Sequence, residues 1–156
     1  MLEVTVPGRG ELVYEHLVLD FNGTLALDGA LLPGVAEQLE ELSADLTVHV
    51  ITADTFGTAA AALSGLPLRL EVLGPGVQGE AKAEAVRKLG AARTVAVGNG
   101  SNDAAMLESA GLGIIVCGPE GMARESLLAA DLVAPDIRAA LDLLLKLERL
   151  VATRRL

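Results

Sequence analysis

The sequence has few aromatic residues and few basic residues for its length of 156. Phe, Trp and Tyr together make up only 2% of it, so it lacks the aromatic side chains on which proteins that bind single-stranded nucleic acid stack bases. The formal net charge of −9 repels nucleic-acid phosphates and anionic membranes. We therefore expect no nucleic-acid partner and no membrane partner. An anionic substrate would need local positive charge, most simply a bound cation.

Signals for disulfides, secretion and membrane spans are also scarce. Cys117 is the only cysteine, which excludes a disulfide framework, and its position after the apolar run 113–116 predicts a buried thiol at a strand end. Residues 1–7 lack a basic segment and a long apolar core, so we expect no signal peptide. No apolar stretch approaches the ~20 residues that a membrane helix needs. The sequence therefore predicts a cytoplasmic protein.

Short apolar runs alternate with helical segments along the chain. The expected strands are residues 2–6, 12–19, 46–52, 68–73, 94–97, 113–116 and 132–133. The expected helices are residues 33–43, a second helix that carries residues 59–63 and stops at Gly65, and residues 80–89, 104–110, 121–129 and 135–151. Pro33 suits the first turn of the first helix. Either Asp54 or Thr55 would cap the second helix.

This alternation predicts an α/β fold, a doubly wound parallel sheet of the Rossmann-like kind. Several strands are continuous apolar runs, which is typical of strands covered by helices on both faces, and we expect residues 68–73 to be a core strand. Pro and Gly within residues 7–10 separate the first two strands and predict an N-terminal β-hairpin. The length and the absence of a linker-like segment predict a single domain over residues 1–156.

Polar residues follow the apolar strands at the points where these strands end. Asp20 closes one strand, Thr52 closes the next, and Asp103 lies in the loop after a third. Lys82 belongs to the helix that precedes this third strand. Ligands bind beyond the carboxyl ends of the strands in such sheets, so we expect these groups to converge on one edge.

The same residues resemble the motifs of the haloacid dehalogenase superfamily. Residues 20–25, Asp-Phe-Asn-Gly-Thr-Leu, resemble its first motif, DxDGTL. Thr52 matches the second motif and Lys82 the third, with Lys88 as the rival lysine. Residues 98–103, Gly-Asn-Gly-Ser-Asn-Asp, resemble the fourth motif, and specifically the GDGxND loop of P-type ATPases. The resemblance runs from about residue 12 to residue 135, with the motifs in the family's order.

The resemblance implies a covalent phosphoryl-transfer reaction that depends on Mg²⁺. Asp20 would attack phosphorus and form an aspartyl phosphate. Mg²⁺ would be held by Asp20, by the backbone carbonyl of Asn22, and by Asn99 and Asp103 of the fourth motif. The activity implied is that of a phosphatase or hydrolase.

The resemblance also implies a set of residues that bind the phosphoryl group. Thr52 would donate a hydrogen bond to it, Lys82 would neutralise its developing charge, and Asn102 would help to hold it. The full set of substrate-binding residues that we expect is Gly23, Thr52, Ala53, Lys82 and Asn102.

The sequence departs from the family pattern at two positions. Asn22 stands where the hydrolase branch has an aspartic acid that protonates the leaving group and then activates water. Positioned proton transfer contributes about 10²–10⁴-fold, so we expect slow turnover and a phospho-enzyme that accumulates. Asn99 replaces an acid of the fourth motif, which removes one anionic ligand and predicts modest Mg²⁺ affinity.

The spacing of the motifs leaves no room for the cap domain that many relatives have. About 30 residues separate Asp20 from Thr52, and about as many separate Thr52 from Lys82. The expected substrate is a phosphorylated small molecule or a phosphoprotein, and a homo-oligomer is a possible cover for the capless site.

Simpler interpretations remain open for each motif. Asn22 and Gly23 also suit a two-residue hairpin turn, Thr52 a strand end without function, and Lys82 a solvated helix face. The fourth motif would then be a plain turn. At the level of function, the alternatives are a phosphorylation-dependent or catalytically weak regulatory binding protein, and a partner subunit of a transporter. We expect His16 and His49, both inside strands, to be structural.

Overall fold

The structure is a computed structural model that describes residues 1–54 and 57–156, so Thr55 lies outside the described residues. The strands are β1 (Leu2–Val6), β2 (Gly10–Tyr14), β3 (His16–Leu19), β4 (Ala26–Leu27), β5 (Ala30–Leu31), β6 (Thr47–Thr52), β7 (Arg69–Val72), β8 (Thr94–Gly98), β9 (Leu112–Val116) and β10 (Leu132–Ala134). The helices are α1 (Val35–Leu42), α2 (Ala59–Ala62), α3 (Gln78–Leu89), α4 (Ala104–Ser109), α5 (Arg124–Ala129), α6 (Ile137–Leu145) and α7 (Leu147–Arg154), with 3₁₀ turns η1 (Ala91–Arg93) and η2 (Ser101–Asp103).

The central sheet confirms the predicted doubly wound α/β fold. Its six strands lie in the order β10-β9-β8-β3-β6-β7, and every neighbouring pair is parallel. β3 lies inside the sheet, and the chain builds outward from it in both directions. The strand order therefore reverses beside β3, where the carboxyl ends of parallel strands form a ligand-binding crevice.

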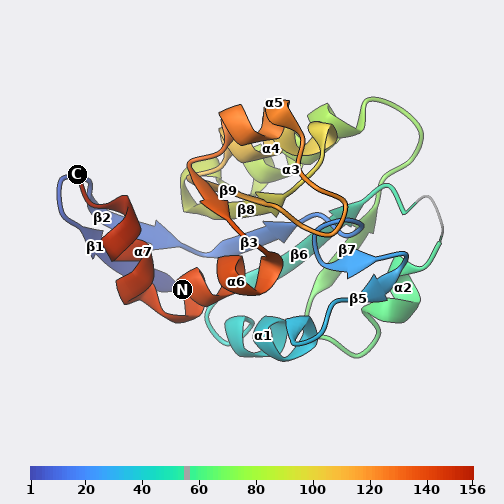
Figure 1. Cartoon of the computed structure of the whole chain (residues 1–156), viewed down its shortest axis with the longest axis horizontal. Helices are drawn as coiled ribbons and strands as arrows, with labels where there is room; N and C mark the ends of the chain where they lie inside the picture. The colour runs from blue at the N-terminus through green and yellow to red at the C-terminus, as the bar shows by residue number, and fades with distance from the viewer. Residues whose placement is uncertain (55–56) are drawn as a thin grey trace.

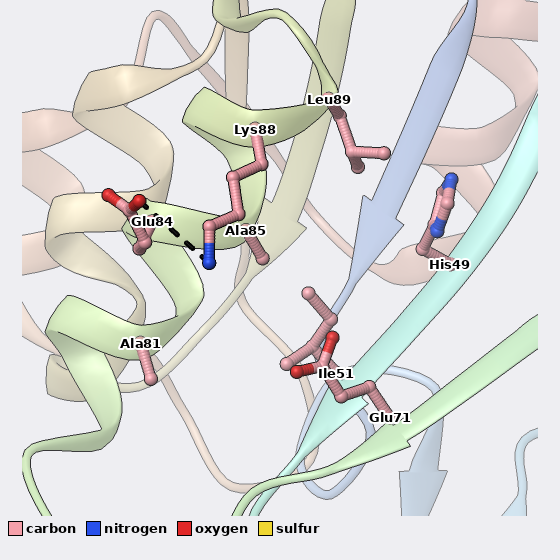
Figure 2. Close-up of a pocket in the computed structure, with 8 residues that line it drawn as sticks. All are labelled: His49, Ile51, Glu71, Ala81, Glu84, Ala85, Lys88 and Leu89. Carbon is pink, nitrogen blue, oxygen red and sulfur yellow. Dashed lines mark ion pairs between the residues drawn. The ribbon is translucent and has the colours of Figure 1, made fainter.

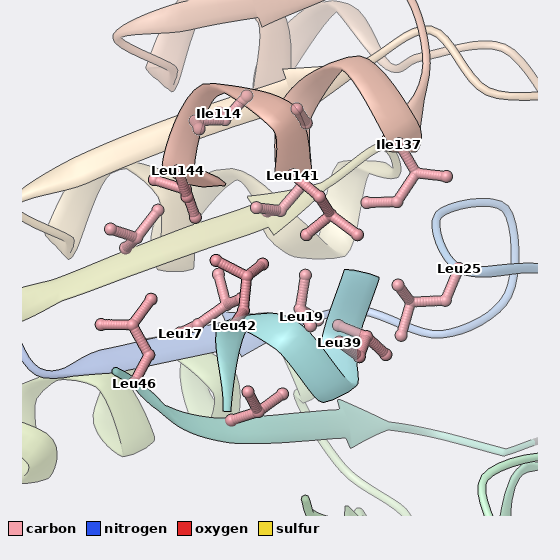
Figure 3. Packing of buried hydrophobic residues seen from close by; sticks show 14 of the residues in the cluster. Leu17, Leu19, Leu25, Leu39, Leu42, Leu46, Ile114, Ile137, Leu141 and Leu144 are labelled. Carbon is pink, nitrogen blue, oxygen red and sulfur yellow. The ribbon is translucent and has the colours of Figure 1, made fainter. Parts of the chain in front are cut away.

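Helices cover both faces of this sheet (Figure 1). Because side chains alternate between the faces of a strand, Leu17 and Leu19 of β3 pack into the core on the side of α1 and α6. Figure 3 shows this core, with leucines of both helices over β3. Val18 points to the other face and joins the smaller cluster under α3 and α4, which contains Val86 and Met106. Both faces of β3 are therefore buried, which holds its carboxyl end in place.

The predicted N-terminal hairpin is confirmed, but its second strand is shorter than expected. β1 pairs antiparallel with β2, whereas β3 pairs parallel with β6 and β8. The chain changes sheets at Glu15. Its backbone N–H donates to the carbonyl of Arg93 at 2.8 Å, and Arg93 directly precedes β8, a strand that pairs with β3. The single strand expected at residues 12–19, which Glu15 and His16 interrupt, is therefore two strands. α7 packs against β1, away from the main sheet (Figure 1).

Three further expectations about the fold are wrong. β7 is an edge strand with most of its residues exposed, not a core strand, because only β6 pairs with it. The last helix breaks into α6 and α7 at Lys146, whose backbone leaves the helical conformation. Cys117 is exposed, because β9 ends one residue before it.

Two loop segments also differ from the expectation. Gly34, with a positive φ of 83°, delays the start of α1 to Val35, so Pro33 precedes the helix. The expected loop at 22–32 contains the short β4–β5 hairpin. Its two-residue turn is Asp28-Gly29, both with positive φ, a sequence that is typical of such hairpins. No helix within residues 1–54 and 57–156 has the length and apolar character that crossing a bilayer takes.

Candidate active site

The carboxyl ends of three adjacent strands meet at one edge of the sheet, as the sequence predicts. Asp20 follows β3, Thr52 ends β6, and Asn99 follows β8 on the other side of β3. Beyond these ends lies a cavity of about 230 Å³. Its lining residues are Asp20, Asn22, Thr52, Ala53, Asp54, Gln78, Asn99, Gly100, Asn102 and Glu120.

Lys82 is the lysine that reaches the site. Its Nζ lies 2.6 Å from Oδ1 of Asp20 and 2.7 Å from Oδ1 of Asp103, and its side chain is fully buried. Lys88, the rival candidate, is 74% exposed and lies 3.9 Å from Glu84. The two lysines belong to one helix, but six residues place them on different faces. Only Lys82 therefore contacts the strand ends.

The buried ion pairs set the protonation of the site. Burial and the nearby carboxylate of Asp103 raise the pKa of Asp20 to about 6, although Lys82 opposes this shift. Burial alone would lower the pKa of Lys82, but the two carboxylates together raise it above its usual value. Near neutral pH, Asp20 is therefore mostly ionised and Lys82 is charged. The site holds an anionic oxygen beside a fixed cation.

Asp103 holds the loop after β8 in place. Its Oδ1 accepts from Lys82, and its Oδ2 accepts from the backbone N–H groups of Asn99 and Gly100, both at 3.0 Å. The side chain is fully buried. Both carboxylate oxygens are engaged, so Asp103 serves as a clamp on Lys82 and the loop.

Thr52 and its neighbours form another side of the cavity. Oγ1 of Thr52 accepts a hydrogen bond from the backbone of Asp54 at 3.0 Å, which leaves its own hydroxyl hydrogen available to a ligand. Asp54 has a positive φ of 41°. Its Oδ1 accepts hydrogen bonds from the backbone N–H groups of Thr58 and Ala59, at 2.8 and 3.2 Å, where α2 begins. It thus caps α2, one of the two expected caps. Ala53 lies between these residues on the cavity wall.

The other expected substrate-binding residues also lie at the cavity or beside it. Asn102 is exposed, and its Nδ2 donates to Oε1 of Gln78 at 3.3 Å. Gly23 has a positive φ of 80°. A Cβ there would overlap the carboxylate of Glu120 and lie 2.7 Å from Nδ2 of Asn99. A glycine is therefore required at this position, both for its backbone conformation and for space.

The two asparagines that replace the family's acids have different surroundings. Oδ1 of Asn22 is buried without a hydrogen-bond partner in the described part of the chain. Asn99 uses both ends of its carboxamide: Oδ1 lies 3.1 Å from the hydroxyl of Thr24, and Nδ2 donates to the carbonyl of Gly121 at 3.1 Å. A carboxylate at position 99 could not donate this second hydrogen bond. Asn99 therefore joins two loops in a way that aspartate cannot.

The oxygen atoms of the cavity suit a hard divalent cation. Such ions prefer carboxylate, amide and carbonyl oxygens, and Asp20, Asn22 and Asn99 offer these around one space. The partnerless Oδ1 of Asn22 is an available ligand atom. No group of three or more His, Cys, Asp or Glu side chains within residues 1–54 and 57–156 is arranged for metal binding. Carboxamide and backbone oxygens would therefore have to complete the coordination.

The sequence reasoning missed four residues of this site. Thr24, fully buried, lies 3.4 Å from Oδ2 of Asp20 as well as near Asn99, and it stands within the first motif. Asp54, Gln78 and Glu120 line the cavity. Thr24 had a local signal, because it belongs to the first motif, whereas the turn sequence Gly-Pro-Glu-Gly at 118–121 does not by itself assign Glu120 to the site.

A larger cavity, about 350 Å³, lies away from the strand ends between α3 and the strands β6 and β7 (Figure 2). Its lining residues are His49, Ile51, Glu71, Ala81, Glu84, Ala85, Lys88 and Leu89. None of these residues belongs to the four motifs. Nε2 of His49 lies 3.3 Å from Nδ1 of His16, and the structural role of both histidines stays a prediction. We place the chemistry at the smaller cavity because the buried ion pairs are there.

Comparisons with known proteins agree with the fold. No protein-family model matches the sequence. The uncharacterized protein MJ0073 of Methanocaldococcus jannaschii is 49% identical over 63 residues, which are 40% of this chain and 68% of that protein.

Two solved structures are similar over most of this chain. The 3-deoxy-D-manno-octulosonate 8-phosphate phosphatase of Moraxella catarrhalis, solved with a magnesium ion, a phosphate ion and KDO, has a TM-score of 0.70 at 18% identity, covering 90% of this chain and 92% of that one. A zinc-transporting PIB-type ATPase in its E2.Pi state has a TM-score of 0.64 at 28% identity, covering 80% of this chain but only 20% of the ATPase.

Proposed function

Since this chain belongs to the same family as MJ0073 and has the fold of the haloacid dehalogenase superfamily, we propose that it transfers phosphoryl groups through an aspartyl phosphate on Asp20. The observation that carries this proposal is the buried arrangement of Asp20, Lys82 and Asp103 at the end of the central strand. One oxygen of Asp20 is fixed by Lys82, and the other, Oδ2, lies on the side of Thr24 at 3.4 Å. This second oxygen is the proposed nucleophile.

In the first step, Oδ2 of Asp20 attacks phosphorus, and the bond between phosphorus and the leaving oxygen breaks. The leaving oxygen takes the electron pair. Thr52 donates its hydroxyl hydrogen to a phosphoryl oxygen, and the charged Lys82 balances the negative charge of the site. In the second step, water attacks the phosphorus of the aspartyl phosphate, the bond to Asp20 breaks, and phosphate is released.

Asn22 limits both steps, since a carboxamide neither supplies nor accepts a proton near neutral pH. The leaving group must therefore be stable as an anion, and the proton of the attacking water must go to solvent. We propose that acyl phosphates, phosphoanhydrides and aryl phosphates react faster than alkyl esters. The natural substrate is then a phosphorylated small molecule or a phosphoprotein of this reactive kind. A second copy of the chain over the open site stays a prediction, as does the single-domain organisation.

A divalent cation fits the oxygen atoms of the cavity, and Mg²⁺ is the proposed one. Asp20, the backbone carbonyl of Asn22 and the side chain of Asn99 would hold it, and Asp103 would act by keeping Lys82 and the loop in place. When bound, such an ion shields the attacking carboxylate from the anionic phosphate and stabilises the charge that develops. Without it, the net charge of −9 works against phosphate binding.

The decisive experiment follows phosphate release from an aryl phosphate with and without Mg²⁺. We expect Mg²⁺-dependent release from the wild type and none above background from Asp20→Asn. This variant keeps the size of the side chain but removes the nucleophilic carboxylate. Intact-mass measurement after acid quenching should find a single added phosphoryl group that Asp20→Asn lacks.

The same measurements separate the enzyme from its alternative. Steady release over many turnovers supports a phosphatase, and one stoichiometric phosphorylation supports the regulatory phospho-acceptor. If the wild type neither reacts nor binds beryllium fluoride in the presence of Mg²⁺, the proposal is wrong and the protein is a binding scaffold.

A further inference from the structure

A turn after β9 brings a carboxylate to the mouth of the site cavity. Residues 118–121, Gly-Pro-Glu-Gly, form this turn, in which Gly121 N donates to Gly118 O at 2.9 Å. Pro at the second position and Gly at the fourth are typical of a tight turn, and Gly121 takes a positive φ of 78°. Glu120 stands at its tip. Its position is therefore a property of a defined turn and not of a long loop.

The turn is held directly against the site loops. Nδ2 of Asn99 donates to the carbonyl of Gly121 at 3.1 Å, and the backbone O of Asn99 accepts from Ala123 N at 2.8 Å. On its other side, a Cβ at Gly118 would overlap the carbonyl oxygen of Gly23. The turn thus touches the first and fourth motifs at once. Its contact with the fourth motif depends on the amide nitrogen that distinguishes Asn99 from aspartate.

Glu120 is exposed to solvent, and its carboxylate lies at the mouth of the cavity. It lies against Gly23, where an added Cβ would overlap it, and it lines the same cavity as Asp20, Asn22 and Asn99. Glu120 forms no ion pair or hydrogen bond with the part of the chain that the structure describes. An unpaired carboxylate at this place would repel an anionic phosphate.

Water solvates this exposed carboxylate while the cavity is empty, but a bound phosphate would need a cation to offset the charge of Glu120. Lys82 is already held between Asp20 and Asp103, so it leaves the charge of Glu120 unbalanced. Resting on the proposed function, we infer that Glu120 is a ligand of the divalent cation and supplies the carboxylate that position 99 lacks. Positions 99 and 120 have then exchanged roles: Glu120 supplies the carboxylate, and the amide of Asn99 holds the turn that presents Glu120.

The test measures cation binding alone, with no phosphoryl donor present. Mg²⁺ is titrated calorimetrically into the whole protein as wild type, Glu120→Gln and Glu108→Gln. The last is a matched control, because Glu108 is an exposed glutamate of α4 that does not line the cavity. We expect Glu120→Gln to weaken Mg²⁺ binding at least about tenfold, since changes around metal ligands typically cost 10–100-fold, and Glu108→Gln to change it less than about twofold.

Equal affinity of Glu120→Gln and wild type would overturn the inference, and so would the absence of Mg²⁺ binding by the wild type in the millimolar range that weak sites reach. The first result leaves the phosphorylation of Asp20, which is followed separately by mass, untouched, whereas the second also removes the Mg²⁺ dependence of the proposed function. Conversely, if Glu120-dependent Mg²⁺ binding is found but Asp20 is never phosphorylated, the proposed function fails while the role of Glu120 stands.

A second variant tests the exchange of roles. In Asn99→Asp combined with Glu120→Gln, the carboxylate returns to position 99, and we expect Mg²⁺ affinity to recover most of the loss seen in Glu120→Gln. Circular dichroism checks that the double variant is folded. A folded double variant that binds Mg²⁺ no better than Glu120→Gln contradicts the exchange.

Discussion

Two cavities of this molecule differ in size, lining and position. The larger of the two, beside α3, is lined by Ala, Ile and Leu side chains together with charged residues (Figure 2). The smaller, beyond β3, is lined mainly by polar residues, among them Asp20, which pairs with the buried Lys82. A fully buried charge is costly unless it is paired. The buried ion pairs beside the smaller cavity are therefore the reason why we propose the chemistry there.

The comparison shows that the volume of a cavity is a poor guide to where chemistry occurs in this fold. Strand ends in a parallel sheet gather loops and backbone N–H groups on one edge, whereas the side of α3 is a gap between a helix and an exposed edge strand. Helix α3 borders both cavities, with Gln78 at the smaller and Lys88 at the larger, and its Lys82 pairs with Asp20 of the smaller one. It therefore provides matched substitutions for testing the contrast.

The largest expected effect is that of Lys82→Met. Removing the ammonium leaves two buried carboxylates unpaired, which typically costs about 3–5 kcal/mol, and phosphoryl transfer should be lost. Urea unfolding and phosphate release measure the two effects. Lys88→Met on the same helix is the control. We expect its free energy of unfolding to change by no more than about 0.5 kcal/mol and its activity to be unaltered. Comparable losses in the two variants would remove the distinction between the cavities.

Asn22→Asp should have an intermediate effect, and in the opposite direction. It introduces a group that can protonate a leaving oxygen and then activate water, so turnover of alkyl phosphates should rise at least about tenfold. Aryl phosphates should gain less, because their leaving groups need no proton. Initial rates on one alkyl and one aryl phosphate measure the difference. An equal gain, or none, would show that proton transfer at position 22 does not limit the reaction.

The smallest expected effect belongs to the larger cavity and concerns stability. Burial, then the neighbouring His16 and Arg69, lowers the pKa of His49 from 6.5 to about 4. Between these values the unfolded chain binds a proton that the folded protein does not, so stability is lost as the pH falls. When the pH is lowered from 7 to 5, we expect the free energy of unfolding of His49→Gln to fall by about 1–2 kcal/mol less than that of the wild type.

Urea unfolding at several pH values measures this difference. His16→Gln is a useful companion variant, because it removes one of the groups that oppose protonation of His49. As the pH falls, this variant should still lose stability, but less than the wild type does. Parallel pH profiles for the wild type and His49→Gln would show that His49 does not titrate as its surroundings suggest. Phosphoryl transfer near neutral pH should be the same in both histidine variants.

Much of the fold was predictable because its signals are local. The alternation of apolar runs and helices predicted the doubly wound sheet, and residues 20–25 and 98–103 predicted which strand ends gather polar groups. Local signals failed where one pattern suits two structures. The segment at 12–19, expected as one strand, divides between two sheets at Glu15, and β7, expected in the core, lies at an edge with Arg69 and Glu71 among its apolar residues.

The sequence by itself determined the type of residue available for chemistry: an aspartate, a threonine and two candidate lysines near strand ends, with asparagines in place of two acids. Only the tertiary structure decided that Lys82 is the one that contacts Asp20, 62 residues away, that Asp103 has no free oxygen, and that Glu120 reaches the cavity. Residue types and short patterns are encoded locally. Contacts between distant residues depend on how helices and turns pack on the sheet, which no single segment specifies.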